Sequence, residues 1–230
     1  MESSRSATAW HREDLESLWR ALDTTEHGLG KAEAAARLER YGPNRLPQQP
    51  PPTIGEILLR QFQSPLIYIL LAAAIVSVIA GDFQDAAFIG VVLAINAVIG
   101  GYQEWRAEQS SRALQQLLHI RASVLRDGEV YEVDAEEVVP GDVVWLESGN
   151  RVPADLRLIS THGFEVDESL LTGESFAVTK DASWTGEAST PVADRLNLAY
   201  AASVVIRGRA KGVVVHTGTA TEVGQLAVDV

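Results

Sequence analysis

The sequence contains no cysteine, and this absence excludes several kinds of protein at once. A disulfide scaffold, a thiolate zinc site and catalysis by a cysteine nucleophile all need a thiol. Basic residues are also scarce, 19 against 31 acids, and a net charge of −12 argues against a general nucleic-acid binder. The chain does have a folding composition, 46% hydrophobic and 22% charged over 230 residues, which excludes wholesale disorder.

The apolar residues are concentrated in two uncharged runs, PLIYILLAAAIVSVIA at 65–80 and AAFIGVVLAINAVIGGY at 86–102. Each run is near the lower length limit for crossing a hydrocarbon core about 30 Å thick. With their uncharged flanks they predict two transmembrane helices, at about 63–81 and 85–103. The loop between them has two Asp and no base, whereas Arg106 and Arg112 follow the second run. By the positive-inside tendency, both termini are then cytoplasmic. A buried helical hairpin in a soluble protein is the alternative.

Local patterns divide the rest of the chain. The spacing of Leu15, Leu18 and Leu22 and the helix formers of 31–41 predict helix over 9–41. Five of the nine prolines lie in 42–53, which predicts an extended linker. We therefore expect a cytoplasmic helical segment with a Pro-rich linker at 1–52, and the two membrane helices with a cytoplasmic stalk at 53–118.

From residue 120 the hydrophobic period changes to that of strands. The segment RASVLRDGEVYEVD predicts a β-hairpin that turns at Asp127-Gly128. Further strands are predicted at 143–147, 156–160, 199–207 and 210–217. Residues 119–230 are thus expected to form a mainly β domain with an acidic surface.

Two signals do not support a site. The run Gly28-Leu29-Gly30-Lys31 resembles a phosphate loop, but Ala32 replaces the required hydroxyl residue and we interpret the glycines as ending a helix. The five histidines, at positions 11, 27, 119, 162 and 216, share no metal-ligand spacing, so no metal site is expected.

One segment does favour chemistry, VDESLLTGESFAVTK at 166–180. Gly173 permits a positive φ, so the backbone can turn sharply and expose Glu174. A carboxylate held between the hydroxyls of Thr172 and Ser175 could orient a water molecule. On spacing alone, a turn with a merely solvated Glu174 is the alternative.

Taken together, these segments resemble the N-terminal part of a P-type cation-transporting ATPase, of the branch with calcium and sodium–potassium pumps. The resemblance rests on motifs in family order: GLGKAEAAARLERYGPNRLP (28–47), QFQSPLIYILLAAA (61–74), INAVIGGYQEWRAEQSSRAL (95–114), VVPGDVVWLESGNRVPADLRL (138–158), VDESLLTGES (166–175) and TGTATEVGQLA (217–227). It covers nearly the whole chain and implies a distorted, jelly-roll-like actuator domain after the membrane helices.

In this family an aspartate of a separate domain takes the γ-phosphate of ATP, and the actuator loop then promotes hydrolysis of the aspartyl phosphate. The resemblance implies that Glu174 positions and activates the water, with Thr172, Gly173 and Ser175 shaping the loop. The complete enzyme would use ATP and Mg²⁺, with none bound by this chain. Its partners would be the lipid bilayer, the remaining pump domains and an inorganic cation, and not nucleic acid.

The chain departs from the family pattern at several positions. Asn150 replaces a usual acid, which predicts a weakened local turn, and Phe176-Ala177 replaces a common pair ending in proline. The branch favours calcium, whereas Gln63, where calcium pumps often have an acid, argues against it. The sequence has no Asp-Lys-Thr-Gly-Thr motif, so we expect no ATP hydrolysis by this chain alone. The alternative is a non-enzymatic, membrane-anchored β-domain.

Overall fold

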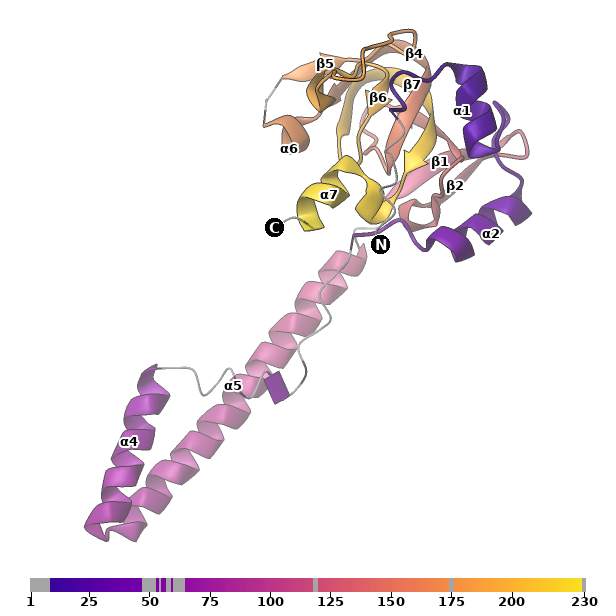
Figure 1. Cartoon of the computed structure of the whole chain (residues 1–230). Coiled ribbons are helices and arrows are strands. Elements are labelled where there is room, and N and C mark those ends of the chain that lie inside the picture. The colour runs from indigo at the N-terminus through magenta and orange to yellow at the C-terminus, as the bar shows by residue number, and fades with distance from the viewer. Residues whose placement is uncertain are drawn as a thin grey trace, which may run out of the picture. The chain divides into compact units, whose positions relative to one another are not determined.

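An antiparallel β-sheet and a separate pair of apolar helices organise the chain (Figure 1). The computed structural model describes residues 9–46, 53, 55–56, 59, 65–117, 120–173 and 176–228, without the side chains of 66, 108 and 110–117. It divides into two units, Met1–Pro47 with His119–Val230, and Gln48–Leu118. Each unit is described by itself, and most of the predicted Pro-rich linker lies outside the described residues.

The helical unit consists of α4, Pro65–Ala80, and α5, Phe83–Leu117. Only Gly81 and Asp82 separate them, because α5 begins at Phe83, two residues before the predicted start of the second helix. Residues 83–107 of α5 are long and apolar enough to cross a membrane, and Ile67–Ala80 is a shorter apolar helix. α5 is 35 residues long, so the second apolar run and the residues after it form one continuous helix.

The described residues of the β unit form seven strands: β1, Arg121–Arg126; β2, Glu129–Asp134; β3, Val143–Glu147; β4, Asp155–Asp167; β5, Ala177–Thr179; β6, Leu198–Ala199; and β7, Val204–His216. All pairs are antiparallel, in the order β2-β1-β3-β7-β4-β5, and β6 pairs with β4. The predicted hairpin at Asp127-Gly128 is confirmed, since Arg126 pairs with Glu129 across the two-residue turn. The expected mainly β domain is therefore present.

Two strand predictions need correction. The segments 199–207 and 210–217 were expected as separate strands, but β7 runs without a break through Gly208, while β6 covers only 198–199. Residues 200–203 between them form a turn, in which Ala202 has a φ of 69°. The reason is tertiary: β7 lies in the middle of the sheet and pairs with β3 on one side and β4 on the other, so its full length is hydrogen-bonded.

Helices of the N-terminal segment pack against the sheet: α1, Leu15–Leu22, and α2, Lys31–Tyr41. Leu18 and Leu22 of α1 form a cluster with Val213 and Val215 of β7. The main core lies within the sheet, where Leu146, Leu156, Phe164 and Val166 are at most 1% exposed: such burial stabilises a side chain by about 1.5–3 kcal/mol. The N-terminal segment is thus part of the same unit as the β-sheet.

The glycine pair of the N-terminal segment was interpreted wrongly as ending a helix. α1 ends at Leu22, capped by Asp23 in the left-handed conformation, and Gly30 is instead the N-cap of α2. Gly28, with a φ of 81°, lies so close to the hairpin of β1 that an added Cβ would stand 1.7 Å from the Leu125 oxygen. The glycine is needed for this close approach, which single-segment periodicity does not reveal.

Shorter elements complete the β unit. The helices are α6, Ser169–Thr172, and α7, Glu222–Val228. The 3₁₀ turns are η1, Ala135–Glu137, η2, Val192–Asp194, and η3, Gly218–Ala220. Of these, α6 connects β4 to β5 and places the segment that the sequence singles out.

Candidate functional site

The segment 166–180 forms an excursion at the edge of the sheet, between β4 and β5 (Figure 1). β5 is the last strand in the sheet order and pairs only with β4, where Asp167 lies opposite Ala177. The side chains of Leu170 and Phe176 are 69% and 82% exposed. A segment at a sheet edge with exposed apolar side chains is free to contact another surface.

Two of the four predicted loop residues are described. Gly173 caps α6 in the left-handed conformation, with φ 75° and ψ 0°, and its N–H donates to the Ser169 oxygen at 2.9 Å. The Thr172 hydroxyl donates to the Glu168 oxygen at 3.2 Å. Glu174 and Ser175 lie outside the described residues, so the roles of all four residues stay predictions.

A buried ion pair joins the residue that follows β4, Glu168, to the residue that follows β5, Lys180. The Lys180 Nζ is 2.7 Å from Oε1 and 2.8 Å from Oε2 of Glu168, and neither side chain is exposed. Burial raises the pKa of Glu168 and lowers the pKa of Lys180, because each charged form loses its hydration. Sequence reasoning missed this pair. Its only signal in the sequence is that Glu168 and Lys180 lie near the two ends of the 166–180 segment.

Two acids of the family-like motif 138–158, Asp142 and Asp155, are buried and accept hydrogen bonds from neighbouring loops. The carboxylate of Asp155 accepts from the Ala201 N–H at 2.9 Å and from the Glu222 N–H at 2.8 Å. It thereby fixes the turn before β7 and the start of α7. Asp142 accepts from Arg126 at 2.9 and 2.7 Å and from the Val139 N–H at 3.0 Å. These acids hold loops together and are fully engaged in doing so.

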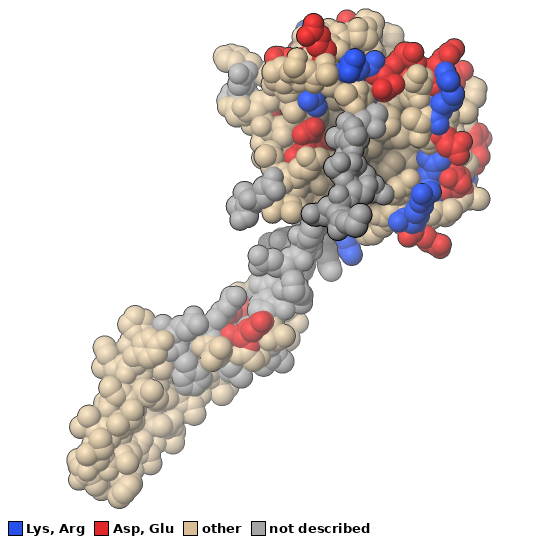
Figure 2. Space-filling view, in the orientation of Figure 1, with Lys and Arg blue, Asp and Glu red and all other residues tan. Residues whose placement is uncertain are grey.

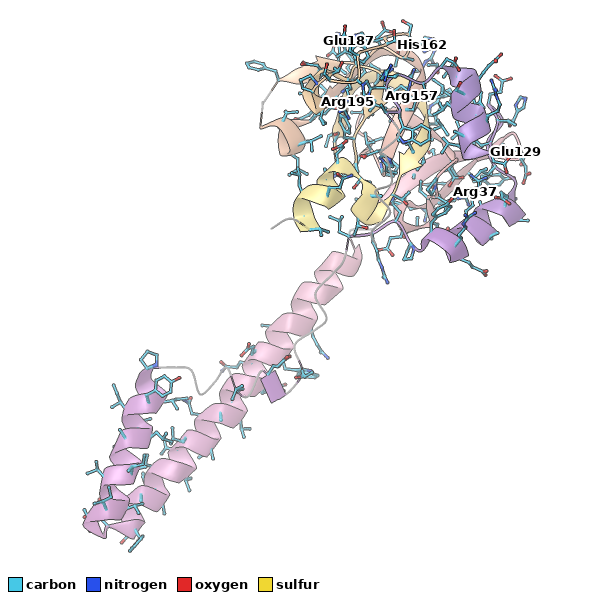
Figure 3. All side chains as sticks on the ribbon, viewed as in Figure 1. Arg37, Glu129, Arg157, His162, Glu187 and Arg195 are labelled. Atoms are coloured by element: carbon cyan, nitrogen blue, oxygen red, sulfur yellow. The ribbon has the colours of Figure 1, made fainter. Side chains whose placement is uncertain are left out.

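Two N-terminal residues fasten their segment to the β domain. Asn44 donates to the Ala135 and Pro153 oxygens at 2.9 and 2.8 Å and accepts from the Gly218 N–H at 2.8 Å. Arg37 is 9% exposed and donates to backbone oxygens at the end of α1 and to the Pro140 oxygen. The position labelled Arg37 in Figure 3 is on α2. The family-like motifs 28–47 and 138–158 are therefore in direct contact, through Arg37 and Pro140 and through Asn44 and Pro153.

The departure at Asn150 does not have the expected effect. We predicted a weakened turn, but the Asn150 side chain accepts from the Glu147 N–H at 2.9 Å and its own N–H donates to the Glu147 oxygen at 2.9 Å. An amide oxygen replaces the carboxylate oxygen as acceptor. Two hydrogen bonds between Asn150 and Glu147 therefore close the turn that follows β3.

Across the described ranges, no three His, Asp or Glu residues come together in a way that could hold a metal ion. His11 is buried against the Glu187 oxygen at 2.8 Å, and His216 accepts from the Trp10 indole at 3.1 Å. His119 lies outside the described residues.

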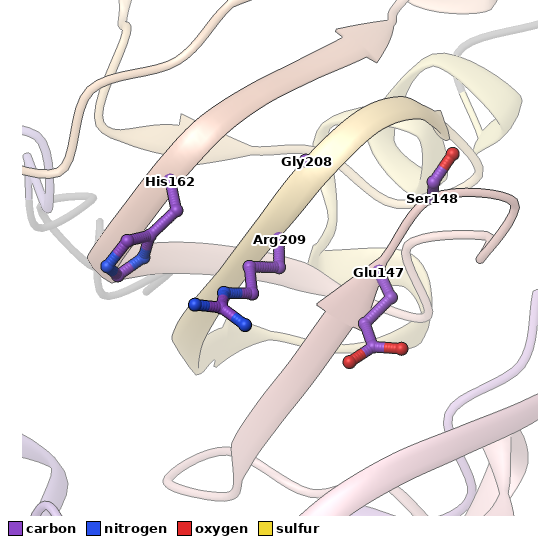
Figure 4. Close-up of a pocket in the computed structure, with 5 residues that line it drawn as sticks. All are labelled: Glu147, Ser148, His162, Gly208 and Arg209. Carbon is purple, nitrogen blue, oxygen red and sulfur yellow. The ribbon is translucent and has the colours of Figure 1, made fainter.

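A surface depression of about 410 Å³ lies elsewhere on the sheet (Figure 4). It is lined by residues of three adjacent strands and the turn after β3: Glu147, Ser148, His162, Gly208 and Arg209. Arg209 is register-paired with Glu147 on one side and His162 on the other. Of the two loop residues that the structure describes, neither Thr172 nor Gly173 lines it.

The fold and its motifs define the class of protein. Residues 116–230 match the P-type ATPase actuator domain, and residues 10–77 match the cation transporter/ATPase N-terminus. The chain belongs to the P-type ATPase family, and to its cation-transporting members.

Curated relatives agree with this assignment. The probable cation-transporting ATPase F of Mycobacterium tuberculosis is 46% identical over 200 residues, which are 87% of this chain and 22% of the relative. The calcium-transporting ATPase 1 of Bacillus cereus is 40% identical over 223 residues, 95% of this chain and 25% of the relative. The sodium/potassium exporting P-type ATPase cta3 of Schizosaccharomyces pombe is 40% identical over 216 residues, which are 93% of this chain and 21% of the relative. The chain spans about a quarter or less of these relatives.

Proposed function

We propose that this chain is the membrane-anchored actuator portion of an ATP-driven cation pump. Its 172–175 loop promotes hydrolysis of an aspartyl phosphate that another domain carries. The observation that supports this proposal best is the position of VDESLLTGES. Its described part lies between β4 and the edge strand β5, in a region that matches the actuator domain. A loop in that position can reach a partner domain without disturbing the core.

In this proposal Glu174 is the catalytic residue. Its carboxylate would orient a water molecule and accept its proton as the water attacks the phosphorus, and the aspartate would leave with the electrons of the broken P–O bond. Thr172, Gly173 and Ser175 would shape the loop. ATP and Mg²⁺ would be bound by other domains of the pump, where the aspartate is phosphorylated.

The helical unit would couple this chemistry to transport. We propose that α4 and α5 cross the bilayer as a two-pass hairpin, with both ends in the cytoplasm and Asp82 at the opposite surface. Movement of the actuator domain would then pull on α4 through the Pro-rich linker and on α5 through the stalk. The relatives include both a calcium-transporting and a sodium/potassium exporting ATPase, so we propose an inorganic cation as substrate without choosing the ion.

Replacement of Glu174 by glutamine tests the proposal. A pump is assembled by joining this chain to the domains that follow the aligned segment in the Bacillus cereus relative. Glu174→Gln should leave phosphoenzyme formation from radioactive ATP unchanged. Breakdown should slow on the order of 10²-fold or more, because the amide accepts no proton. The matched control is Glu187→Gln, an exposed acid of the same domain, which should break down normally.

A normal breakdown rate in the Glu174→Gln pump would contradict the catalytic role. It would favour the non-enzymatic alternative, in which the β unit is a membrane-anchored binding domain. With a binding domain of that kind, loss of the Glu174 carboxylate would leave phosphoenzyme breakdown unchanged.

A further inference from the structure

The Glu168–Lys180 pair lies at the ends of the two strands that precede and follow the predicted catalytic loop in the sequence. Glu168 directly follows β4, and Lys180 directly follows β5. The pair therefore links the residue at which the chain leaves β4 to the residue that follows β5, three positions beyond Ala177, where the chain rejoins the sheet. Both carboxylate oxygens lie within 2.8 Å of the ammonium group, and both side chains are fully buried.

Backbone and aromatic groups around the pair fix it further. The Glu168 oxygen accepts from the N–H groups of Leu171 and Thr172, at 2.9 and 3.0 Å, so one residue holds both α6 and Lys180. The Lys180 Nζ also donates to the Arg195 oxygen at 3.4 Å and lies 5.3 Å from the ring centroid of Tyr200. The position labelled Arg195 in Figure 3 is in the same β unit.

Stability alone does not account for such a pair. Taking two charges out of water costs about as much as their attraction returns, and well-packed apolar side chains are often equally stable in its place. What a buried pair provides and an apolar contact does not is direction, because the Lys180 ammonium must donate to Oε2 of Glu168 at hydrogen-bond distance. A directional contact at the base of a loop restricts where the loop can stand.

We infer that Glu168 and Lys180 are positioning residues, which set the 172–175 loop at the distance and angle that phosphoenzyme hydrolysis requires. The inference rests on the proposed function and adds to it two residues that touch no reacting atom. A displacement of a catalytic group by about 1 Å can cost on the order of 10²-fold in rate. Loosening the base of the loop should cost less, about tenfold, because the productive position is still visited.

The deciding variant replaces both partners, Glu168→Met with Lys180→Met. It leaves no unpaired buried charge, and we expect its melting temperature to stay near that of the unchanged chain. In the assembled pump, phosphoenzyme formation should be unchanged and breakdown about tenfold slower. In the 230-residue chain in detergent, the amides of 169–173 and 176–179 should exchange hydrogen about tenfold faster.

Two further variants make the test specific. Arg207→Gln breaks an exposed ion pair with Glu165 of β4, close to the same strands, and should change neither loop exchange nor breakdown. Glu168→Asp keeps both charges but shortens the side chain by one methylene. It should slow breakdown by less than the double variant does. It also tests the positioning role if the double variant does not fold.

The outcomes separate this inference from the proposed function. A folded double variant, or a folded Glu168→Asp variant, with a normal breakdown rate would overturn the positioning role. If Glu174→Gln slows breakdown and the pair variants do not, only the positioning role is wrong. If Glu174→Gln leaves breakdown unchanged, the proposed function itself is wrong.

Discussion

The two units of this chain place their apolar side chains in opposite ways. In the β unit, Leu156, Phe164 and Val205 are at most 1% exposed, whereas in the helical unit Ile79, Phe88 and Val98 are 80%, 73% and 68% exposed. On the face seen in Figure 2, α4 shows only uncharged side chains. The β unit follows the rule for a protein in water, and the helical unit suits an apolar surrounding. The same apolar residue types are thus buried in one unit and exposed in the other, as expected for one unit in water and one in an apolar surrounding.

The units also differ in how polar groups are used. The β unit buries charged and amide side chains that bridge distant segments, such as Arg37, Asn44 and Asp155. The apolar stretch of α5, by contrast, satisfies its backbone within the helix, as a segment in lipid must. This comparison predicts that the two units respond differently to comparable substitutions.

The largest effect is expected in the β unit, at the Arg126–Asp142 pair. Arg126→Ala leaves the fully buried carboxylate of Asp142 without its cation and should destabilise the unit by about 3–5 kcal/mol. The control is Arg121→Ala on the same strand, whose ion pair with Glu132 is exposed. It should cost less than about 1 kcal/mol. Urea unfolding followed by near-UV circular dichroism measures both, and equal losses would contradict the prediction.

A second test places one lysine in each unit. Val91 of α5 and Val130 of β2 are 57% and 59% exposed, so in water both should accept a lysine within about 0.5 kcal/mol. If α5 crosses a membrane, Val91→Lys should instead lower insertion by about 2.5–3.5 kcal/mol. Insertion is measured by membrane fractionation and glycosylation mapping. Equal insertion of the two variants would favour a soluble helical hairpin.

The smallest effect concerns the start of α1 and its dependence on pH. The Ser17 N–H donates to Asp14 at 2.7 Å, and this hydrogen bond lowers the pKa of Asp14 below its usual 3.8. The contribution of the cap to stability is then present above pH 3.8 and is lost as the pH falls through the lowered pKa. Asp14→Asn keeps an acceptor without a titrating group and should remove this part of the acid dependence. Urea unfolding between about pH 6 and pH 2 compares the two chains, and identical pH profiles would show that Asp14 does not contribute.

Much of the fold could be predicted because its signals are local. Alternation and an Asp-Gly turn specify the β1–β2 hairpin, and uncharged runs specify α4 and α5. Long-range pairing could not be predicted in the same way. β7 is one strand because neighbours on both sides satisfy its hydrogen bonds, and Gly28 begins rather than ends a helical region because β1 approaches it.

The candidate site shows the same division between local and long-range information. The sequence by itself determined the family-like loop motif, the left-handed glycine within it and the apolar helices that precede it. Only the tertiary structure decided that Glu168 and Lys180 meet beneath the loop, and that Asn44 ties the N-terminal segment to three distant turns. A single buried contact leaves no period in the sequence, because its partners are chosen by where the folded chain brings them and by the high cost of leaving a buried polar group unpaired.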